Sequence, residues 1–207
     1  PAGVTYRWGI KGSSGTSESS VAKHAWIHHN WFRDYNSGYQ GADTRGDAME
    51  VGESGIVSYA NTLVAGWYIE DNVVTNAQLA GESLFDVKYG GCVIRRNTVD
   101  VASSDCKIQA RMGRNSILES NYMASGVVQV YGKGHKIVGN HGALRVNAGE
   151  DSWDVLSNLH HQSVDTLVAK NTGSLTVGYQ ANAAYTFPAL TTTIEEHSGT
   201  ITLDADG

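Results

Sequence analysis

The stretch that decides the fold is Ile94-Arg95-Arg96-Asn97-Thr98-Val99: an aliphatic residue, two variable residues, an asparagine and a β-branched pair. The same phrase, in clear or degraded form, recurs along most of the chain. Its asparagines are Asn30, Asn72, Asn97, Asn121, Asn140, Asn158 and Asn171. Around Asn97 the copies lie about 24 residues apart, a period that indicates a stacked repeat structure.

A period of about 24 residues matches one coil of a parallel β-helix with three short strands per coil. The aliphatic residue of each coil should point inward, so we expect Ile27, Ile69, Ile94, Leu118 and Ile137 to form one interior column. Asparagine suits the bend between strands because it tolerates a left-handed backbone, and successive asparagines can hydrogen-bond as a ladder. A β-sandwich is the alternative, but its turns recur about every 8–12 residues.

Composition supports this fold, with 24 glycines, only 2 prolines and 41% hydrophobic residues. We therefore predict an all-β chain that forms a right-handed, single-stranded parallel β-helix, with one domain over residues 1–207. We expect it to be a processed form or a fragment of a longer chain. Its apolar stretches are too short for a membrane span, which argues against a membrane partner. Cys92 and Cys106 are either buried thiols or a single disulfide bridge.

The charge pattern indicates the kind of ligand. The net charge is −6, which argues against nucleic acid as a partner. Residues 86–114 nevertheless carry six basic residues against three acidic ones. A basic region in an acidic protein suits a polyanion that is bound at one place, although scattered surface charge would give the same count.

Five segments between Arg45 and Asn140 resemble the alginate lyase and chondroitinase B family of parallel β-helix polysaccharide lyases. They are residues 45–52 (RGDAMEVG), 81–88 (GESLFDVK), 97–98 (NT), 110–113 (ARMG) and 128–135 (VQVYGKGH). The resemblance covers a little under half of the chain. It implies a secreted or periplasmic enzyme that cleaves an acidic, uronic-acid-containing polysaccharide such as alginate.

The resemblance also assigns residues. It implies Lys88 as the catalytic base and Arg111 as its catalytic partner. It implies five substrate-binding residues, which are Glu82, Arg114, Gln129, Tyr131 and His135. Most calcium ligands of the family's metal-dependent members have no counterpart here, because Glu82 lies one residue out of register. We therefore expect no metal site and no cofactor.

The chemistry of β-elimination fits Lys88 and Arg111. The C5 proton of a uronic acid becomes acidic only when a cation neutralises the neighbouring carboxylate, and a base must then face C5. Lysine is a suitable base when its surroundings favour the neutral amine. Arginine binds a carboxylate through two parallel hydrogen bonds. An exposed ladder of charges is the structural alternative for this pair.

Other functions remain open at this point. A β-helical glycosidase would need two facing carboxylates, and the candidates are Asp43, Asp47, Glu50, Glu53, Glu82 and Asp86. A uronate epimerase would remove the same C5 proton. A non-catalytic carbohydrate-binding β-helix, such as an adhesin or a tail spike, is the rival from another class.

Several other conspicuous residues are expected to be structural. The pairs His28-His29 and 160–161 should not chelate a metal, because adjacent strand residues point to opposite faces. We interpret Arg95 and Arg96 as solvated turn charges. We expect core or coil-end packing for the aromatic residues Trp26, Trp31, Trp67 and Tyr68.

Overall fold

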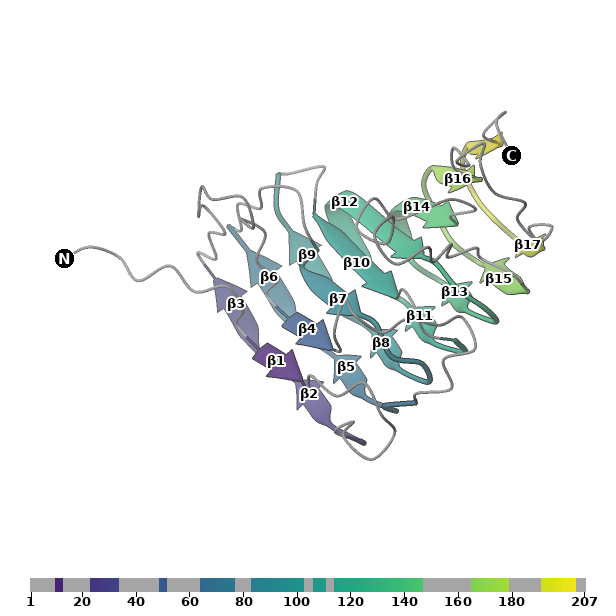
Figure 1. Cartoon of the computed structure of the whole chain (residues 1–207). Coiled ribbons are helices and arrows are strands. Elements are labelled where there is room, and N and C mark those ends of the chain that lie inside the picture. Colours follow the sequence, from purple (N-terminus) through teal and green to yellow (C-terminus); the bar gives the residue numbers. More distant parts are fainter. Residues whose placement is uncertain are drawn as a thin grey trace, which may run out of the picture.

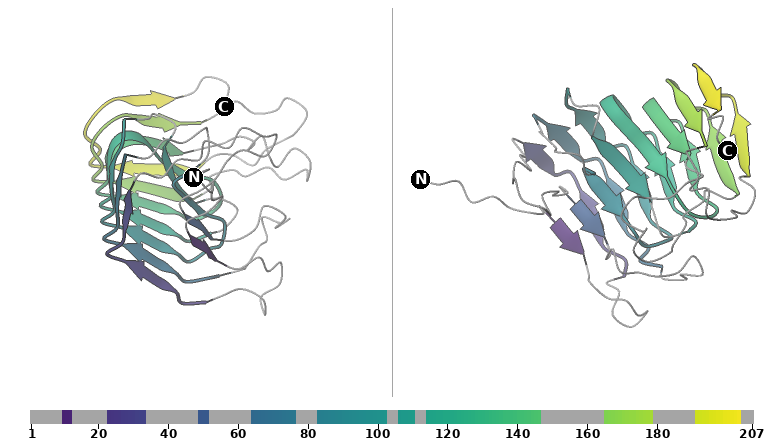
Figure 2. Two further views of the ribbon diagram at one scale, coloured as in Figure 1. Left: turned by 90° about the vertical axis from the view of Figure 1, so that its left-hand side faces the viewer. Right: turned by 45° about the horizontal axis from the view of Figure 1, so that its top comes forward.

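The computed structural model describes residues 10–12, 23–33, 49–51, 64–76, 83–102, 106–110, 114–146, 165–178 and 191–203. Within these residues the secondary structure consists of strands, and every strand pair is parallel. The strands stack side by side into two long curled sheets (Figure 1, Figure 2). The prediction of an all-β, parallel, solenoid-like fold is therefore confirmed.

The larger of the two sheets has eight strands in spatial order, with three further strands beside them. The eight are β1 (Ile10–Gly12), β4 (Met49–Val51), β7 (Phe85–Val87), β10 (Lys107–Ala110), β12 (Tyr122–Val130), β14 (His141–Val146), β16 (Leu175–Val177) and β18 (Ile201–Leu203). The three are β3 (Trp31–Arg33), β6 (Val73–Thr75) and β9 (Thr98–Asp100), which pairs with β12. We call this the large sheet.

The second sheet has seven strands, which again follow one another at intervals along the chain. They are β2 (Trp26–His28), β5 (Tyr68–Glu70), β8 (Val93–Arg95), β11 (Ile117–Glu119), β13 (Lys136–Val138), β15 (Thr166–Ala169) and β17 (Thr192–Glu195). We call this the small sheet. Its first six strands, from β2 to β15, each carry the apolar start of one repeat.

One coil consists of three short strands, as the repeat length predicts. After β7, β8 and β9 the next coil begins with β10, which pairs with β7. The long strand β12 occupies two successive strand positions in the stack. Its start pairs with β9 through Tyr122, and its end pairs with β10 from Val127 onward. The register of β12 against β14 shifts between these two residues. Gly126 lies inside the shift with a φ of 94°, which is costly for any residue with a Cβ atom.

The predicted interior column is confirmed. Ile27 pairs with Ile69, Ile69 with Ile94, Ile94 with Leu118, and Leu118 with Ile137. The last four side chains are completely buried. A single coil has no neighbour against which to bury such a side chain, so the column is stabilised only by stacking.

The predicted asparagine ladder is also present. The amide Nδ2 of Asn72 donates to Oδ1 of Asn97 over 2.9 Å, and Asn97 donates to Asn121 in the same way. Asn121 donates to Asn140 over 2.9 Å, and Asn140 to Asn171 over 3.1 Å. The backbone N–H of each donor also reaches the same Oδ1. These amides are buried, so the ladder replaces the hydrogen bonds that water would have supplied.

Two details of the sequence prediction are wrong. The left-handed backbone belongs to the residue before the asparagine, at His29, Asp71, Arg96, Ser120, Gly139 and Lys170. This residue makes the bend, which leaves the asparagine free to point inward and join the ladder. Asn140 bonds directly to Asn171, so Asn158, which lies outside the described residues, is not the rung between them.

Replacing Asn97 with alanine should destabilise the protein strongly. The change removes the acceptor of the Asn72 backbone N–H and the donor to the Ile69 carbonyl oxygen, both of which are far from water. We expect a loss of about 3 kcal/mol in the free energy of unfolding, measured by urea denaturation. Asn30→Ala is the matched control at the exposed end of the ladder, and it should cost less than about 1 kcal/mol. Equal losses at the two positions would contradict a buried ladder.

Candidate functional site

A row of polar side chains runs across the outward face of the large sheet. Glu50 pairs with Asp86, Asp86 with Gln109, and Gln109 with Gln129. Their apolar neighbours along each strand belong to the hydrophobic core. Because successive strand residues point to opposite faces, the four polar residues must face away from the core. All four are nevertheless at most 5% exposed.

Lys88 joins this row directly after strand β7. Its side chain is 2% exposed, and its Nζ lies 2.5 Å from Oε1 of Glu50 and 3.2 Å from Oδ2 of Asp86. The alternative of an exposed charge ladder is therefore wrong for Lys88. Two carboxylates in contact favour the ammonium form of the lysine. Breaking such a buried group apart is costly, because one charge would remain without a partner.

The row continues through two glutamines to a tyrosine. Nε2 of Gln109 donates to Oδ1 of Asp86 over 3.1 Å. Nε2 of Gln129 donates to Oε1 of Gln109 over 2.8 Å and to the hydroxyl oxygen of Tyr131 over 3.1 Å. Glu50, Lys88, Asp86, Gln109, Gln129 and Tyr131 thus form one connected group, which we call the polar row.

Of the residues assigned from sequence, Lys88, Gln129 and Tyr131 meet in the polar row. Arg111 and Glu82 lie outside the described residues. Ala110 directly precedes Arg111, and it pairs with Val87 and Val130. Val87 directly precedes Lys88, and Val130 directly precedes Tyr131.

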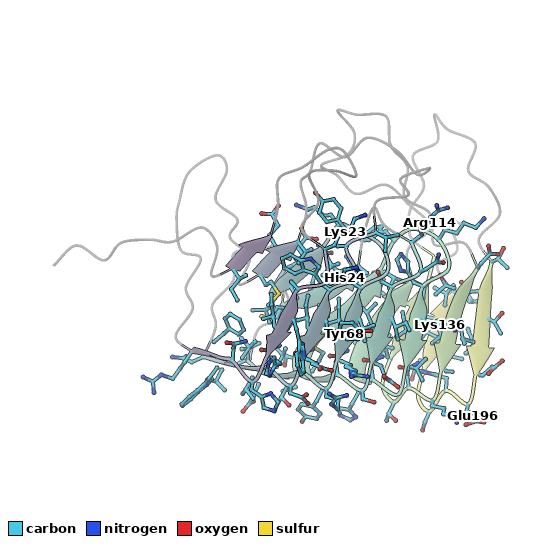
Figure 3. The ribbon with its side chains drawn as sticks, turned by 90° about the horizontal axis from the view of Figure 1, so that it is seen from below. Lys23, His24, Tyr68, Arg114, Lys136 and Glu196 are labelled. Atoms are coloured by element: carbon cyan, nitrogen blue, oxygen red, sulfur yellow. The ribbon has the colours of Figure 1, made fainter. Side chains whose placement is uncertain are left out.

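The remaining two assigned residues occupy turns. His135 is completely buried, where its Nδ1 accepts the backbone N–H of Ser116 over 3.2 Å and its Nε2 lies 2.8 Å from the carbonyl oxygen of Tyr131. These contacts give His135 the turn-capping role that the sequence left open. Arg114 is half-buried, and its backbone pairs with that of Lys133 in an isolated parallel β-bridge (Figure 3).

Sequence reasoning missed Gln109 and considered Glu50 and Asp86 only as glycosidase carboxylates. The signal that could have found them is an apolar-polar-apolar triplet, repeated as Met-Glu-Val (49–51), Phe-Asp-Val (85–87), Ile-Gln-Ala (108–110) and Val-Gln-Val (128–130). In a parallel stack, the middle residues of such triplets must lie in one row.

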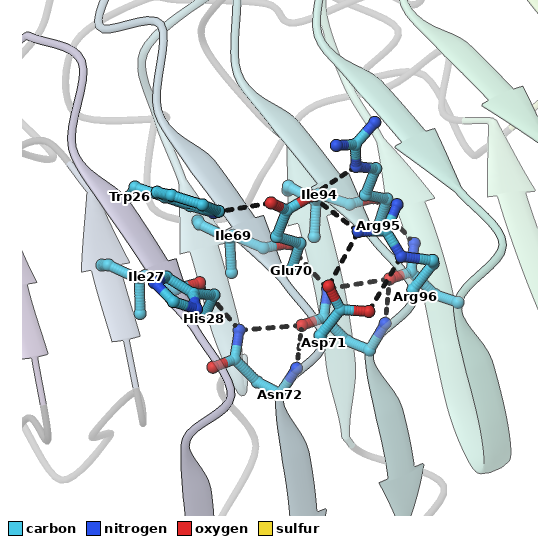
Figure 4. Close-up of polar contacts among 12 residues, drawn as sticks. Trp26, Ile27, His28, Ile69, Glu70, Asp71, Asn72, Ile94, Arg95 and Arg96 are labelled. Atoms are coloured by element: carbon cyan, nitrogen blue, oxygen red, sulfur yellow. Dashed lines mark hydrogen bonds and ion pairs between the residues drawn. The ribbon is translucent and has the colours of Figure 1, made fainter.

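A second polar group lies on the outward face of the small sheet (Figure 4). Glu70 accepts Nε1 of Trp26 over 2.6 Å, Nε of Arg95 over 2.5 Å and Nη2 of Arg96 over 2.9 Å. Asp71 accepts two hydrogen bonds from Arg96. Arg96 is an exposed turn residue, as expected, whereas Arg95 belongs to strand β8 and is half-buried. Both arginines also form ion pairs that link neighbouring coils, which the sequence did not predict.

The exposed aromatic residues also differ from the expectation. Trp67 is buried as expected, but Trp26, Trp31 and Tyr68 are 62%, 63% and 44% exposed. Trp26 and Tyr68 are paired residues of the small sheet, in the same outward row as Lys136 (Figure 3). The ring of Trp26 is stacked on His28 with centroids 4.1 Å apart.

The structure also corrects or limits several smaller expectations. Cys92 and Cys106 are free buried thiols, and burial raises the pKa of Cys92 to about 11. Nδ1 of His28 and Nδ1 of His29 lie 2.8 Å apart, because the left-handed turn at His29 brings the rings together rather than to opposite faces. In the described part of the chain no cluster of three or more metal-ligating side chains occurs. No helix there is long and apolar enough to span a membrane.

Comparisons with known proteins place the chain in no family: no protein-family model, no curated protein and no solved structure matched it.

The Glu70 group should make stability depend on pH. Burial alone would raise the pKa of Glu70, but the hydrogen bonds from Arg95 and Trp26 lower it below the ordinary 4.5. A hydrogen bond from Arg96 likewise lowers the pKa of Asp71 below 3.8. A carboxylate with a lowered pKa in the folded state stabilises the fold above its unfolded pKa and loses this effect as pH falls through the folded value.

We therefore expect Glu70→Gln to unfold more easily than wild type at pH 7, and the difference to vanish at pH values well below about 4. Urea denaturation between these pH values measures it. A difference that stays constant across the range would contradict the role of the ionised carboxylate.

Proposed function

We propose that this chain is a right-handed, single-stranded parallel β-helix that acts as a lyase on an acidic, uronic-acid-containing polysaccharide, in a secreted or periplasmic setting. The observation that carries the proposal is the polar row across successive coils of the large sheet, with Lys88 at its charged end. A polymer laid along the stack would meet one coil about every 4.8 Å. The right-handed sense is supported by the strong preference of parallel β connections for it.

The proposed reaction is β-elimination. A base takes the C5 proton, and the electron pair of the C–H bond forms the C4–C5 double bond. The C4–O bond breaks, and the leaving oxygen keeps the bonding electrons and takes a proton from water. Arg111 neutralises the substrate carboxylate and assists the leaving oxygen. The donated charge-assisted hydrogen bonds stabilise the charge that develops on the carboxylate.

Lys88 must lose its own proton before it can accept one from C5. Glu50 is the acceptor in contact with it, at 2.5 Å. Transfer between these two groups would leave a neutral pair, which a buried setting tolerates better than separated charges. Since the polar row is buried, substrate entry requires a local rearrangement of the groups around it.

The same contacts argue against a glycosidase at this place. A glycosidase needs two carboxyl groups that face each other across the scissile bond. The Nζ atom of Lys88 contacts both Glu50 and Asp86 and therefore occupies the space between these two carboxyl groups.

Replacing Lys88 with alanine tests the lyase proposal. Elimination creates a double bond conjugated to a carboxylate, which absorbs ultraviolet light, so a panel of alginate, glycosaminoglycans, pectate and glucuronan can be screened directly. We expect kcat to fall by about 10²–10⁴-fold while the polymer still binds. The screen should be run after exhaustive chelation, because the proposal needs no metal.

Lys107→Ala is the matched control, since it removes a half-buried lysine from the neighbouring strand β10. It should change substrate affinity and salt dependence and leave kcat close to wild type. Normal turnover by a folded Lys88→Ala variant would contradict the assigned base, and activity restored only by added calcium would contradict the metal-free reaction.

A second candidate function is non-catalytic glycan binding by the small sheet. Trp26 and Tyr68 form an exposed aromatic pair, and the hydrogen bond to Glu70 together with the stacking on His28 fixes the ring of Trp26. Exposed, pre-oriented aromatic rings are suited to stacking on the apolar faces of sugars.

Under this second function, Trp26→Ala should weaken polysaccharide binding by at least about tenfold in a calorimetric titration. Trp31→Ala is the matched control, because Trp31 is equally exposed but belongs to β3 of the large sheet. If both variants bind like wild type, the aromatic pair is not a glycan platform.

A further inference from the structure

The charged residues at one end of the polar row determine which way the side-chain amides of Gln109 and Gln129 point. Asp86 contacts the ammonium of Lys88 at 3.2 Å, so it is ionised and can only accept hydrogen bonds. Gln109 must therefore turn its Nε2 toward Asp86, and it does so over 3.1 Å. This orientation leaves Oε1 of Gln109 facing the next coil.

The orientation of Gln109 in turn determines the orientation of Gln129. Only an N–H can meet Oε1 of Gln109, so Gln129 presents its Nε2 there over 2.8 Å. Flipping the amide of Gln129 would place two oxygen atoms against each other. The orientation of Gln129 is thus fixed by Asp86, two coils away in the same row.

The consequence is a buried acceptor at the end of the chain of amides. Gln129 is 2% exposed, and within the described residues its Oε1 has no hydrogen-bond partner. Buried polar atoms are nearly always paired, and leaving one unpaired is costly. A pre-oriented acceptor that persists without a donor is a feature expected of a binding site.

We propose that Oε1 of Gln129 is the acceptor of a glycan subsite that takes an uncharged hydrogen-bond donor, either a sugar hydroxyl or the N–H of an acetamido group. The inference rests on the proposed function, because it takes the ligand to be a glycan. A carbonyl oxygen repels carboxylate and sulfate groups, so the acidic group of the sugar must lie elsewhere. Gln129 then selects a neutral donor within an acidic polymer.

The test compares two variants at Gln129 with one at Gln109. Gln129→Met removes the acceptor, whereas Gln129→Lys keeps an N–H toward Oε1 of Gln109 and puts a positive donor where the acceptor was. Gln109→Met is the comparison variant, because it keeps Oε1 of Gln129 but removes the partner that fixes the direction of its amide. Urea denaturation establishes that each variant is folded.

Binding is measured by calorimetry with three probes: oligomannuronate, a chondroitin oligosaccharide and a neutral cello-oligosaccharide. For each probe that wild type binds, we expect Gln129→Met and Gln129→Lys to bind about tenfold more weakly. Gln109→Met, in which the amide of Gln129 is free to turn, should lose less affinity than either of them. A loss with oligomannuronate or the cello-oligosaccharide identifies a hydroxyl as the donor. A loss confined to the chondroitin probe identifies the acetamido N–H.

Three results would overturn the inference. The first is wild-type affinity in Gln129→Met. The second is tighter binding by Gln129→Lys, because it would place an anion at this subsite. The third is a wild-type protein that binds none of the three probes. Binding that depends on Gln129 without any ultraviolet-absorbing product would instead overturn the lyase proposal and leave the subsite standing.

Discussion

Hydrogen bonding between the asparagines of successive coils is the constraint on which the rest of this structure depends. From Asn72 to Asn140, each amide receives two N–H groups from one neighbouring coil and donates to the other. A coil therefore cannot slip by one residue without breaking buried hydrogen bonds on both sides. A slip of one residue would also turn the aliphatic column outward. The ladder and the column therefore impose the same register, and each coil is stable only between neighbours.

This fixed register determines what the outer faces can do. In a parallel stack, equivalent residues of successive coils form straight rows, so a single polar position per coil becomes the row that joins Glu50, Asp86, Gln109 and Gln129. On the small sheet the same rule produces a paired aromatic surface with an ion-pair group beside it. The two faces differ in kind, since the polar row is buried while Trp26 and Tyr68 are exposed. A buried charged group suits chemistry or strict selection, and an exposed aromatic pair suits looser attachment to a polymer.

The sequence predicted the fold better than the site, for physical reasons. The column and the ladder repeat one phrase, so local periodicity reveals them directly. The sequence predicted the left-handed conformation for the asparagine itself, but the residue before it adopts that conformation. Tolerance for a left-handed backbone is only one property of asparagine, and here the buried amide is used for the ladder instead. Lys88 could be singled out from its surroundings in sequence, but its contacts with Glu50, 38 residues earlier, depend on the register of two coils. The exposure of Trp26 and Trp31 likewise depends on which face each strand presents, and short strands of three residues give little pattern from which to infer it.

The central claim is that the outward face of the large sheet holds the ligand, and hydrogen–deuterium exchange with and without an acidic oligosaccharide tests it most directly. The account predicts slower exchange on ligand addition for the backbone amides of β4, β7, β10 and β12, which carry the polar row, with β5, β8 and β11 unchanged. Protection confined to the small sheet would contradict the claim and favour glycan attachment at the aromatic pair. Unchanged exchange throughout, with every uronate polymer tried, would contradict it as well.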